Sequence, residues 1–317
     1  MRDPHRIIAI ETTLIKFINR RSEVALHAVR NLLVRNTRLL TTKGAIKQFD
    51  IAFPGAGPVK ITRAQLTAMI RREMRARLGN KIVKETVRKS MARGYTAGLR
   101  QGARIISKAS GADVASTIMT SDRRMIRALS KGMWNRLDAL DTYITSELQY
   151  LVQEGMIKGW GTRADVKTIA DKIVSKHLKM MNPKIARIVR TEMIRAANFG
   201  ILSVASRNGS HFYFWTSTFT EVTCEVCMGL DGRIFKIGQG LMPPIHPNCR
   251  CFVVPIVEDT EYTLEGFGVV DVSKIDTSPM TPARRDKYLA EVAGVGKLRI
   301  KRWRDTGVLP PPIAVGG

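Results

Sequence analysis

The sequence has few aromatic residues, few acidic residues, few cysteines and no long apolar run. Aromatic residues make up only 6% of the 317 residues, and Ala, Ile, Leu, Met and Arg are frequent, so we expect helices rather than a large sheet. No apolar run approaches the roughly 18 residues of a membrane span. Glu11 and Lys16 interrupt the N-terminal stretch where a signal peptide would be uninterrupted. We therefore expect no stable membrane insertion, and synthesis in a reducing, cytosol-like compartment.

Acidic residues are outnumbered by basic residues, 27 against 52, which gives a formal net charge of +25. Residues 1–100 hold 22 Lys and Arg against 6 Asp and Glu, whereas residues 201–317 hold 13 against 12. This charge favours a polyanionic partner, with nucleic acid first and an anionic membrane second. One basic segment is predicted to contact DNA phosphates non-specifically, although its side chains can equally be solvated. Its residues are Arg63, Arg71, Arg72, Arg75, Arg77, Lys81, Lys84, Arg88 and Lys89.

The four cysteines all lie in one stretch, as Cys224-x-x-Cys227 and Cys249-x-Cys251, with His246 three residues before the third. The cysteines and the histidine form two pairs of nitrogen or sulfur ligands, and the short segment between the pairs contains an Asp-Gly turn. This arrangement indicates a closed structural zinc site. Five candidate ligands compete for four places, and the spacing leaves the choice open. Buried free thiols or disulfides are the alternative. A deaminase-type catalytic zinc would need H-x-E and P-C-x-x-C, which are absent.

Apolar residues recur at helical spacing through most of the chain before residue 209. The expected helices cover 6–40 as one or two helices, 62–79, a segment that closes at 110–111, 121–159, and a helix that starts at 162. An Asn182-Pro183 pair predicts the start of a further helix that ends near 208.

Glycines at every fourth position, Gly94, Gly98 and Gly102, predict a smooth helix face that a neighbouring helix approaches closely. The alternative is a membrane helix of the GxxxG type, but the arginines beside these glycines would be costly in lipid.

The pattern changes at His211, where an aromatic and β-branched run predicts a strand under the cysteine site. Further strands are expected around Ile234 and Phe235 and over 252–256. Beyond residue 257 we expect an arm with one short helix that starts at Thr281-Pro282 and ends at Gly294. The fold class is therefore α+β, a mostly helical N-terminal two-thirds with a small β-rich, zinc-stapled module and an extended tail. The expected divisions are a basic arm over 1–52, a basic helical body over 58–161, the cysteine module over 162–257 and the C-terminal arm over 258–317.

The order of motifs carries a resemblance to a known family. An Arg-Thr-Glu helix with Ala and Asn downstream is followed by a Trp strand, then TCxxCxxLxG, and finally PPxHPNCRC with a strand that ends in proline. This order resembles the Mu-F-like minor head, or head morphogenesis, proteins of tailed phages and prophages, over roughly residues 165–257. One departure is Glu221, where the family has an aspartate. The matching residues are Arg190, Thr191, Glu192, Ala196, Asn198, Trp215, Thr223, Cys224, Cys227, Leu230, Gly232, Pro243, Pro244, His246, Pro247, Asn248, Cys249, Arg250, Cys251 and Pro255.

The resemblance implies a structural virion component that lies inside the capsid, is associated with the portal protein and faces packaged double-stranded DNA. Contact with the major capsid protein is a further implication. Two other classes stay open, a zinc-dependent DNA-binding regulator and an effector enzyme related to toxin-bearing family members. Two readings apply to this motif. In one, Glu192 is a catalytic carboxylate, and in the other, Arg190 and Glu192 are structural partners of the small domain. The second reading is preferred, because no second acid, nucleophile or phosphate loop accompanies Glu192, so no catalytic residue is assigned.

Overall fold

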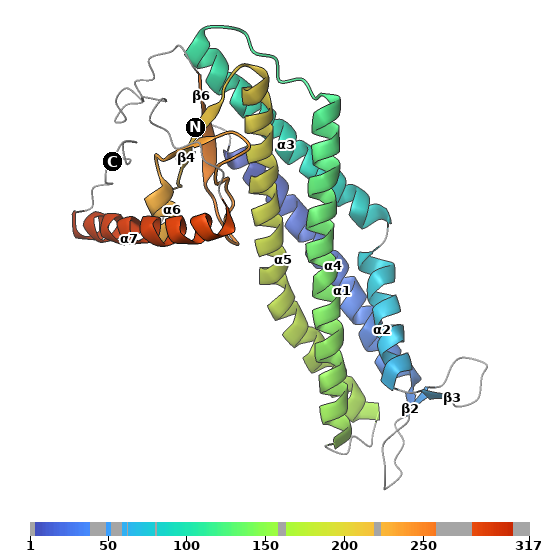
Figure 1. Ribbon diagram of the computed structural model, residues 1–317. Helices are drawn as coiled ribbons and strands as arrows, with labels where there is room; N and C mark the ends of the chain where they lie inside the picture. The colour runs from blue at the N-terminus through green and yellow to red at the C-terminus, as the bar shows by residue number, and fades with distance from the viewer. Residues whose placement is uncertain are drawn as a thin grey trace. The chain divides into compact units, whose positions relative to one another are not determined.

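The computed structural model (Figure 1) describes residues 4–38, 49–51, 59–61, 63–79, 81–157, 163–218, 223–257 and 281–306. Its elements confirm an α+β fold that is mostly helical, with a small antiparallel sheet in the cysteine region. The helices are α1 Pro4–Asn36, α2 Arg63–Leu78, α3 Lys81–Ser110, α4 Thr120–Ile157, α5 Arg163–Arg207, α6 Glu225–Leu230 and α7 Pro282–Thr306. The strands are β1 Thr37–Arg38, β2 Phe49–Ile51, β3 Val59–Ile61, β4 Phe212–Thr216, β5 Ile234–Lys236 and β6 Phe252–Ile256.

The chain forms two compact units, each assembled from stretches that are distant in sequence. One unit combines Met1–Glu11, Lys89–Leu129 and Arg190–Gly317, and it holds all the cysteines. The other combines Thr12–Arg88 and Ser130–Val189, and it holds the small antiparallel sheet β1-β2-β3. The four segments expected along the chain stay a prediction. The expected loop at 53–58 lies outside the described residues.

Helices α3 and α5 approach each other closely in the first unit, as the glycines of α3 predict. A Cβ atom added at Gly98 would lie 2.0 Å from the carbonyl oxygen of Ala197, and one added at Gly200 would lie 2.2 Å from the carbonyl oxygen of Tyr95. Real Cβ contacts are essentially never shorter than 3.0 Å. The glycines are therefore required by backbone contact between two helices. Among the described residues, no helix has the length and apolar character needed to cross a membrane.

Helix α5 contradicts the prediction of a new helix at Pro183, because it runs without a break from Arg163 to Arg207 with Pro183 inside it. A proline in a helix interior removes one backbone hydrogen bond and costs about 3 kcal/mol. The apolar face continues through the proline, since Val174, Met181, Ile185 and Val189 are all buried. Burial of this face offsets the local cost, so the proline interrupts the sequence pattern without starting a new helix.

The second sheet has the order β5-β4-β6, with both neighbours antiparallel to β4, and it confirms the three strands expected in this region. Side chains alternate across β4. Tyr213 and Trp215 face a core that also contains Cys227, Cys249 and Cys251. The other face presents an apolar set to a second, smaller cluster. That set is Phe212, Phe214, Ile234, Val254 and Ile256.

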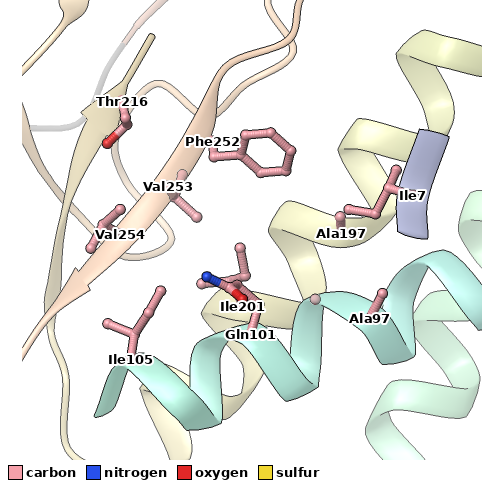
Figure 2. A pocket seen from close by; sticks show the side chains of 11 residues that line it. Ile7, Ala97, Gln101, Ile105, Ala197, Ile201, Thr216, Phe252, Val253 and Val254 are labelled. Carbon is pink, nitrogen blue, oxygen red and sulfur yellow. The ribbon is translucent and has the colours of Figure 1, made fainter. Parts of the chain in front are cut away.

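A small cavity of about 50 Å³ lies where β4 and β6 meet α3, α5 and the start of α1 (Figure 2). Its walls are apolar except for Gln101 and Thr216. The side-chain oxygens Gln101 Oε1 and Thr216 Oγ1 are buried and have no hydrogen-bond partner among the described residues. The cavity has room for a few water molecules and two polar atoms to bind them.

Helix α7 contradicts the expected short helix that ends at Gly294, because it extends to Thr306. Gly296 lies where α7 crosses α6, and a Cβ atom there would be 1.8 Å from the carbonyl oxygen of Glu225. On the other side of the crossing, a Cβ atom at Gly229 would be 1.8 Å from the carbonyl oxygen of Val292. Gly296 and Gly229 thus allow close packing of the two helices, whereas a Cβ atom at Gly294 would have nothing within 4 Å.

Candidate metal centre

The first pair of cysteines lies at the start of α6, a helical turn that the sequence did not predict. Cys224 is the N-cap residue, and its sulfur accepts a hydrogen bond from the backbone N–H of Cys227 at 3.3 Å. A cap and a residue three positions later lie on the same side of a helix start, so both sulfurs point into the same space. The Asp231-Gly232 pair forms the turn from α6 into β5, and Gly232 has a φ of 81°.

The second group of ligand candidates lies in the loop before β6 and meets the first pair. His246 Nε2 is 3.2 Å from Cys224 Sγ and 3.0 Å from Cys227 Sγ. Cys227 Sγ is 3.8 Å from Cys249 Sγ. The potential ligand atoms fall into two overlapping sets in which all atoms lie within 4.8 Å of one another, and Cys227 belongs to both. The structure therefore brings together all five residues that the sequence proposed, as a cluster that could hold a metal ion. The two sets are Cys224, Cys227 and His246, and Cys227, Cys249 and Cys251.

These distances can be compared with a tetrahedral zinc ion. Zinc–sulfur and zinc–nitrogen bonds of about 2.3 Å and 2.0–2.1 Å imply about 3.8 Å between two sulfurs and about 3.5 Å between sulfur and nitrogen. The separation of Cys227 and Cys249 agrees with the first value, and those of His246 from Cys224 and Cys227 are a few tenths of an ångström shorter than the second. His246 Nδ1 lies 2.9 Å from the carbonyl oxygen of Pro247. Nδ1–H donates to that oxygen, so Nε2 faces the sulfurs. Nε2 carries a proton while the ring is charged, and after loss of that proton its lone pair can bind metal, as in known metal-binding histidines.

The cluster also favours the ionised thiols that zinc requires. Hydrogen bonding with Cys227, together with that from His246, lowers the pKa of Cys224 to about 4 against the opposing effect of burial. Hydrogen bonds with Cys227 and Cys251 likewise lower the pKa of Cys249. Hydrogen bonds with Cys224 and Cys249 raise the pKa of His246 to about 10. Cys224 and Cys249 are therefore thiolates at neutral pH, which is the form of cysteine that binds metal.

Hydrogen bonds with Cys224 and Cys249 raise the pKa of Cys227, and the pKa of Cys251 is raised as well. Cys251 differs from the other cysteines in that its thiol has a hydrogen-bond partner outside the cluster. Hydrogen bonding with Cys227 lowers its pKa, but hydrogen bonding with Cys249 and nearly complete burial raise it more, to about 12. Its thiol donates to Ser217 Oγ at 3.6 Å, and Ser217 in turn donates to the carbonyl oxygen of Cys227. Cys251 is thus a neutral thiol with a hydrogen-bond partner of its own.

Helix α5 supports the loop that carries His246 and Cys249. Asn198 is fully buried, and its amide donates to the carbonyl oxygens of Pro243 and Cys251 at 3.2 and 3.1 Å. Its side-chain oxygen accepts from the backbone N–H of Val253 at 3.2 Å. At the tip of the loop, the backbone N–H of Asn248 donates to Thr191 Oγ1 at 3.0 Å. Helix α5 therefore holds the loop that carries His246 and Cys249, which we call the metal loop, through Thr191 and Asn198.

Arg250, between the two cysteines of the loop, forms a second connection that the sequence did not reveal. One of its guanidinium nitrogens lies 2.9 Å from both carboxylate oxygens of Glu11, which is 2% exposed. Burial raises the pKa of Glu11, although the charge of Arg250 acts in the opposite direction. The sequence alone shows Glu11 only as a charged residue that interrupts the apolar N-terminal stretch.

Helix α7 is fastened to the turn after α6 by a buried ion pair. Arg299 Nη2 lies 3.2 Å from Asp231 Oδ2, and the other oxygen of Asp231 accepts from the backbone N–H of Ser217 at 2.8 Å. Val292 of α7 is fully buried in the core that contains the cysteines. The C-terminal helix thus packs on the cysteine module.

The remaining motif residues lie near this site without forming a catalytic arrangement among the described residues. Glu192 is buried on α5, and its carboxylate lies 3.3 Å from Arg195 Nε in the same helix. Arg190 is half-buried, and its charge acts on Glu11. Trp215 is fully buried beneath the cysteines.

Most of the basic residues predicted to contact DNA are exposed on α2 and α3. Arg77 is half-buried and pairs with Glu73, Arg88 pairs with Glu85 at 2.7 Å, and Lys84 lies 5.1 Å from the centre of the Trp134 ring. The side chain of Arg63 lies outside the described residues. The exposed members are Arg71, Arg72, Arg75, Lys81, Lys84, Arg88 and Lys89.

A capped CxxC turn, a three-stranded antiparallel sheet and an HxxCxC loop held by a long helix define an α+β module built around a candidate metal centre. Residues 146–254 match the family model described as phage Mu protein F like protein. The match places this region in the Mu-F-like phage head morphogenesis family and confirms the resemblance carried by the motifs. The matched family suggests a phage head morphogenesis protein. No curated protein and no solved structure matches the chain significantly.

Proposed function

We propose that the protein is a structural minor head protein of a tailed phage or prophage. In this proposal it lies inside the capsid at the portal vertex, contacts packaged DNA and aids head assembly and DNA packaging or ejection. The main support is that the family match over 146–254 contains the Cys224–Cys227 pair, His246, Cys249 and the α5 residues that hold their loop. The motif therefore corresponds to one packed structural module.

We propose further that the module is stapled by one zinc ion bound to Cys224, Cys227, His246 and Cys249. These four side chains combine the short mutual distances with two lowered thiol pKa values. Cys251 supports the site from outside as a thiol bonded to Ser217. Zinc would cross-link the start of α6 to the loop before β6, and such a closed site would add to the stability of the module.

The proposed DNA contact rests on charge and exposure. The chain has a net charge of +25, and seven of the nine predicted residues have exposed side chains on α2 and α3. Exposed Lys and Arg neutralise phosphates without reading sequence, which suits a protein that faces packaged DNA of any sequence. The portal protein is the proposed protein partner, and the major capsid protein is a further candidate.

Location distinguishes this function from a zinc-dependent DNA-binding regulator. Particles purified from an induced host should contain the protein at a few copies per particle, with one zinc per chain in native mass spectrometry. A Cys224→Ser variant should lose the zinc and be missing from particles. Absence of the unmodified protein from particles would reject the head-protein function, whereas a zinc-free wild type that is packaged normally would reject only the zinc staple.

A further inference from the structure

The last turns of α7 form one wall of a cleft whose other wall is the start of α6. The cleft has a volume of about 650 Å³ and lies beside Cys224. Three of its lining side chains are basic, namely Lys297, Lys301 and Arg304. Spacings of four and three residues place them along one side of the helix. Their span of seven residues corresponds to about 10 Å along the helix axis.

Few acidic groups neutralise this side of α7 among the described residues. Lys297 lies 3.7 Å from Glu225, and both side chains are largely exposed, so the pair is weak. Lys301 and Arg304 are exposed and have no ion-pair partner in the part of the chain that the structure describes. Asp305 also lines the cleft. Three basic and two acidic residues line the cleft, so its formal net charge is +1.

The basic residues of α7 fall into two groups with different positions. Arg299 points inward, is 7% exposed and pairs with Asp231, so its role is to hold the helix on the module. Lys301 and Arg304 point outward and hold nothing in the described structure. Arg299 therefore has a structural role, whereas the outward pair is available to an anionic partner outside the chain.

We propose that this cleft binds the phosphate backbone of double-stranded DNA, as a contact separate from the basic surface of α2 and α3. The inference rests on the proposed function, in which the protein faces packaged DNA. Lys and Arg are the side chains that bind phosphate oxygens most often, and contacts to phosphate alone need no base recognition. A row about 10 Å long that lies parallel to the duplex axis spans roughly three base-pair steps of 3.4 Å. The family match ends at residue 254, so α7 lies beyond the matched region.

The test compares two double variants of the full chain, Lys301→Gln/Arg304→Gln in the cleft and Arg285→Gln/Lys287→Gln on exposed positions of the same helix. Both remove two positive charges, so they control for net charge. Binding to a 25-base-pair duplex is measured by fluorescence anisotropy over a range of KCl concentrations. The slope of log K against log salt is negative, and each lost phosphate contact should reduce its magnitude by about 0.9. The slope of the cleft variant should therefore be smaller in magnitude by about 1.8. The helix control should lose clearly less.

Several results would overturn the proposal. Equal losses in both variants would mean that only net charge matters. No loss in the cleft variant would mean that these cations are solvated or are neutralised within the chain, for which residues 258–280 supply six acidic residues. If wild-type chain does not bind DNA at all, the DNA contact of the proposed function fails as well. A third variant changes Arg71, Arg72, Arg75 and Arg77 to Gln. If this variant flattens the salt dependence and the cleft variant does not, the proposed function survives and this inference fails. Unchanged thermal unfolding of both double variants confirms that they are folded.

Discussion

Replacement of Asn198 by alanine should test whether α5 holds the metal loop. The side chain makes three hydrogen bonds, to the carbonyl oxygens of Pro243 and Cys251 and from the N–H of Val253, and it is fully buried. Alanine leaves three buried backbone groups without these partners, at about 1–3 kcal/mol each. Partial entry of water reduces this sum, so we expect a loss of about 3–5 kcal/mol.

The assay is thermal unfolding together with zinc retention. For a unit of this size, 1 kcal/mol corresponds to about 2–4 °C, so the unfolding of the cysteine module should shift downward by roughly 10 °C. The loop also carries His246 and Cys249, so zinc should be lost faster to a chromophoric chelator. An Asn198→Asp variant should be no better than alanine, because a carboxylate cannot donate to the two carbonyl oxygens.

Asn31 provides the matched control, because it is exposed on α1. Asn31→Ala should change stability by less than about 0.5 kcal/mol. The reasoning would be refuted if Asn198→Ala unfolded within about 1 kcal/mol of wild type and released zinc at the wild-type rate. In that case the three hydrogen bonds would accompany the loop conformation without determining it.

Three further variants test separate parts of the structure. Gly98→Ala should cost at least about 2 kcal/mol in thermal unfolding, because its Cβ would lie 2.0 Å from a carbonyl oxygen of α5, whereas Gly132→Ala, which meets only a flexible arginine, should be neutral or stabilising. Cys251→Ser should keep one zinc per chain in native mass spectrometry, whereas Cys249→Ser should not. Thr216→Val should unfold at or above the wild-type temperature, since its hydroxyl has no partner among the described residues; a loss above about 1 kcal/mol would reveal a bound water or ligand in the cavity.

Local patterns predicted the parts of the site that depend on local geometry. The CxxC and HxxCxC spacings identified all five residues of the cluster, and the run around Tyr213 and Trp215 identified the strand beneath them. The glycine repeat of α3 predicted a close helix neighbour, because a helix face without side chains has little other use in water. In each case the physical cause lies within a few residues of the sequence.

Long-range packing decided the features that the sequence did not reveal. Pro183 and Gly294 are strong local signals for helix boundaries, yet α5 and α7 continue through them. A continuous buried face offsets the proline, and α7 continues past Gly294 to cross α6 at Gly296. Glu11 and Arg250 are 239 residues apart, so nothing in either local sequence indicates their ion pair.

The same long-range packing changes the interpretation of charge around the metal centre. Within the stretch from Cys224 to Cys251 only three residues are basic. Helix α7 returns to the site from 46 residues beyond Cys251 and brings Lys297 and Lys301 to the cleft beside Cys224. Its inward Arg299 fixes the helix to Asp231, so the outward cations are held on a rigid element and not on a free arm. A metal that fixes α6 would therefore also fix one wall of the cleft, and loss of zinc should weaken the binding of DNA there even though no metal ligand touches phosphate.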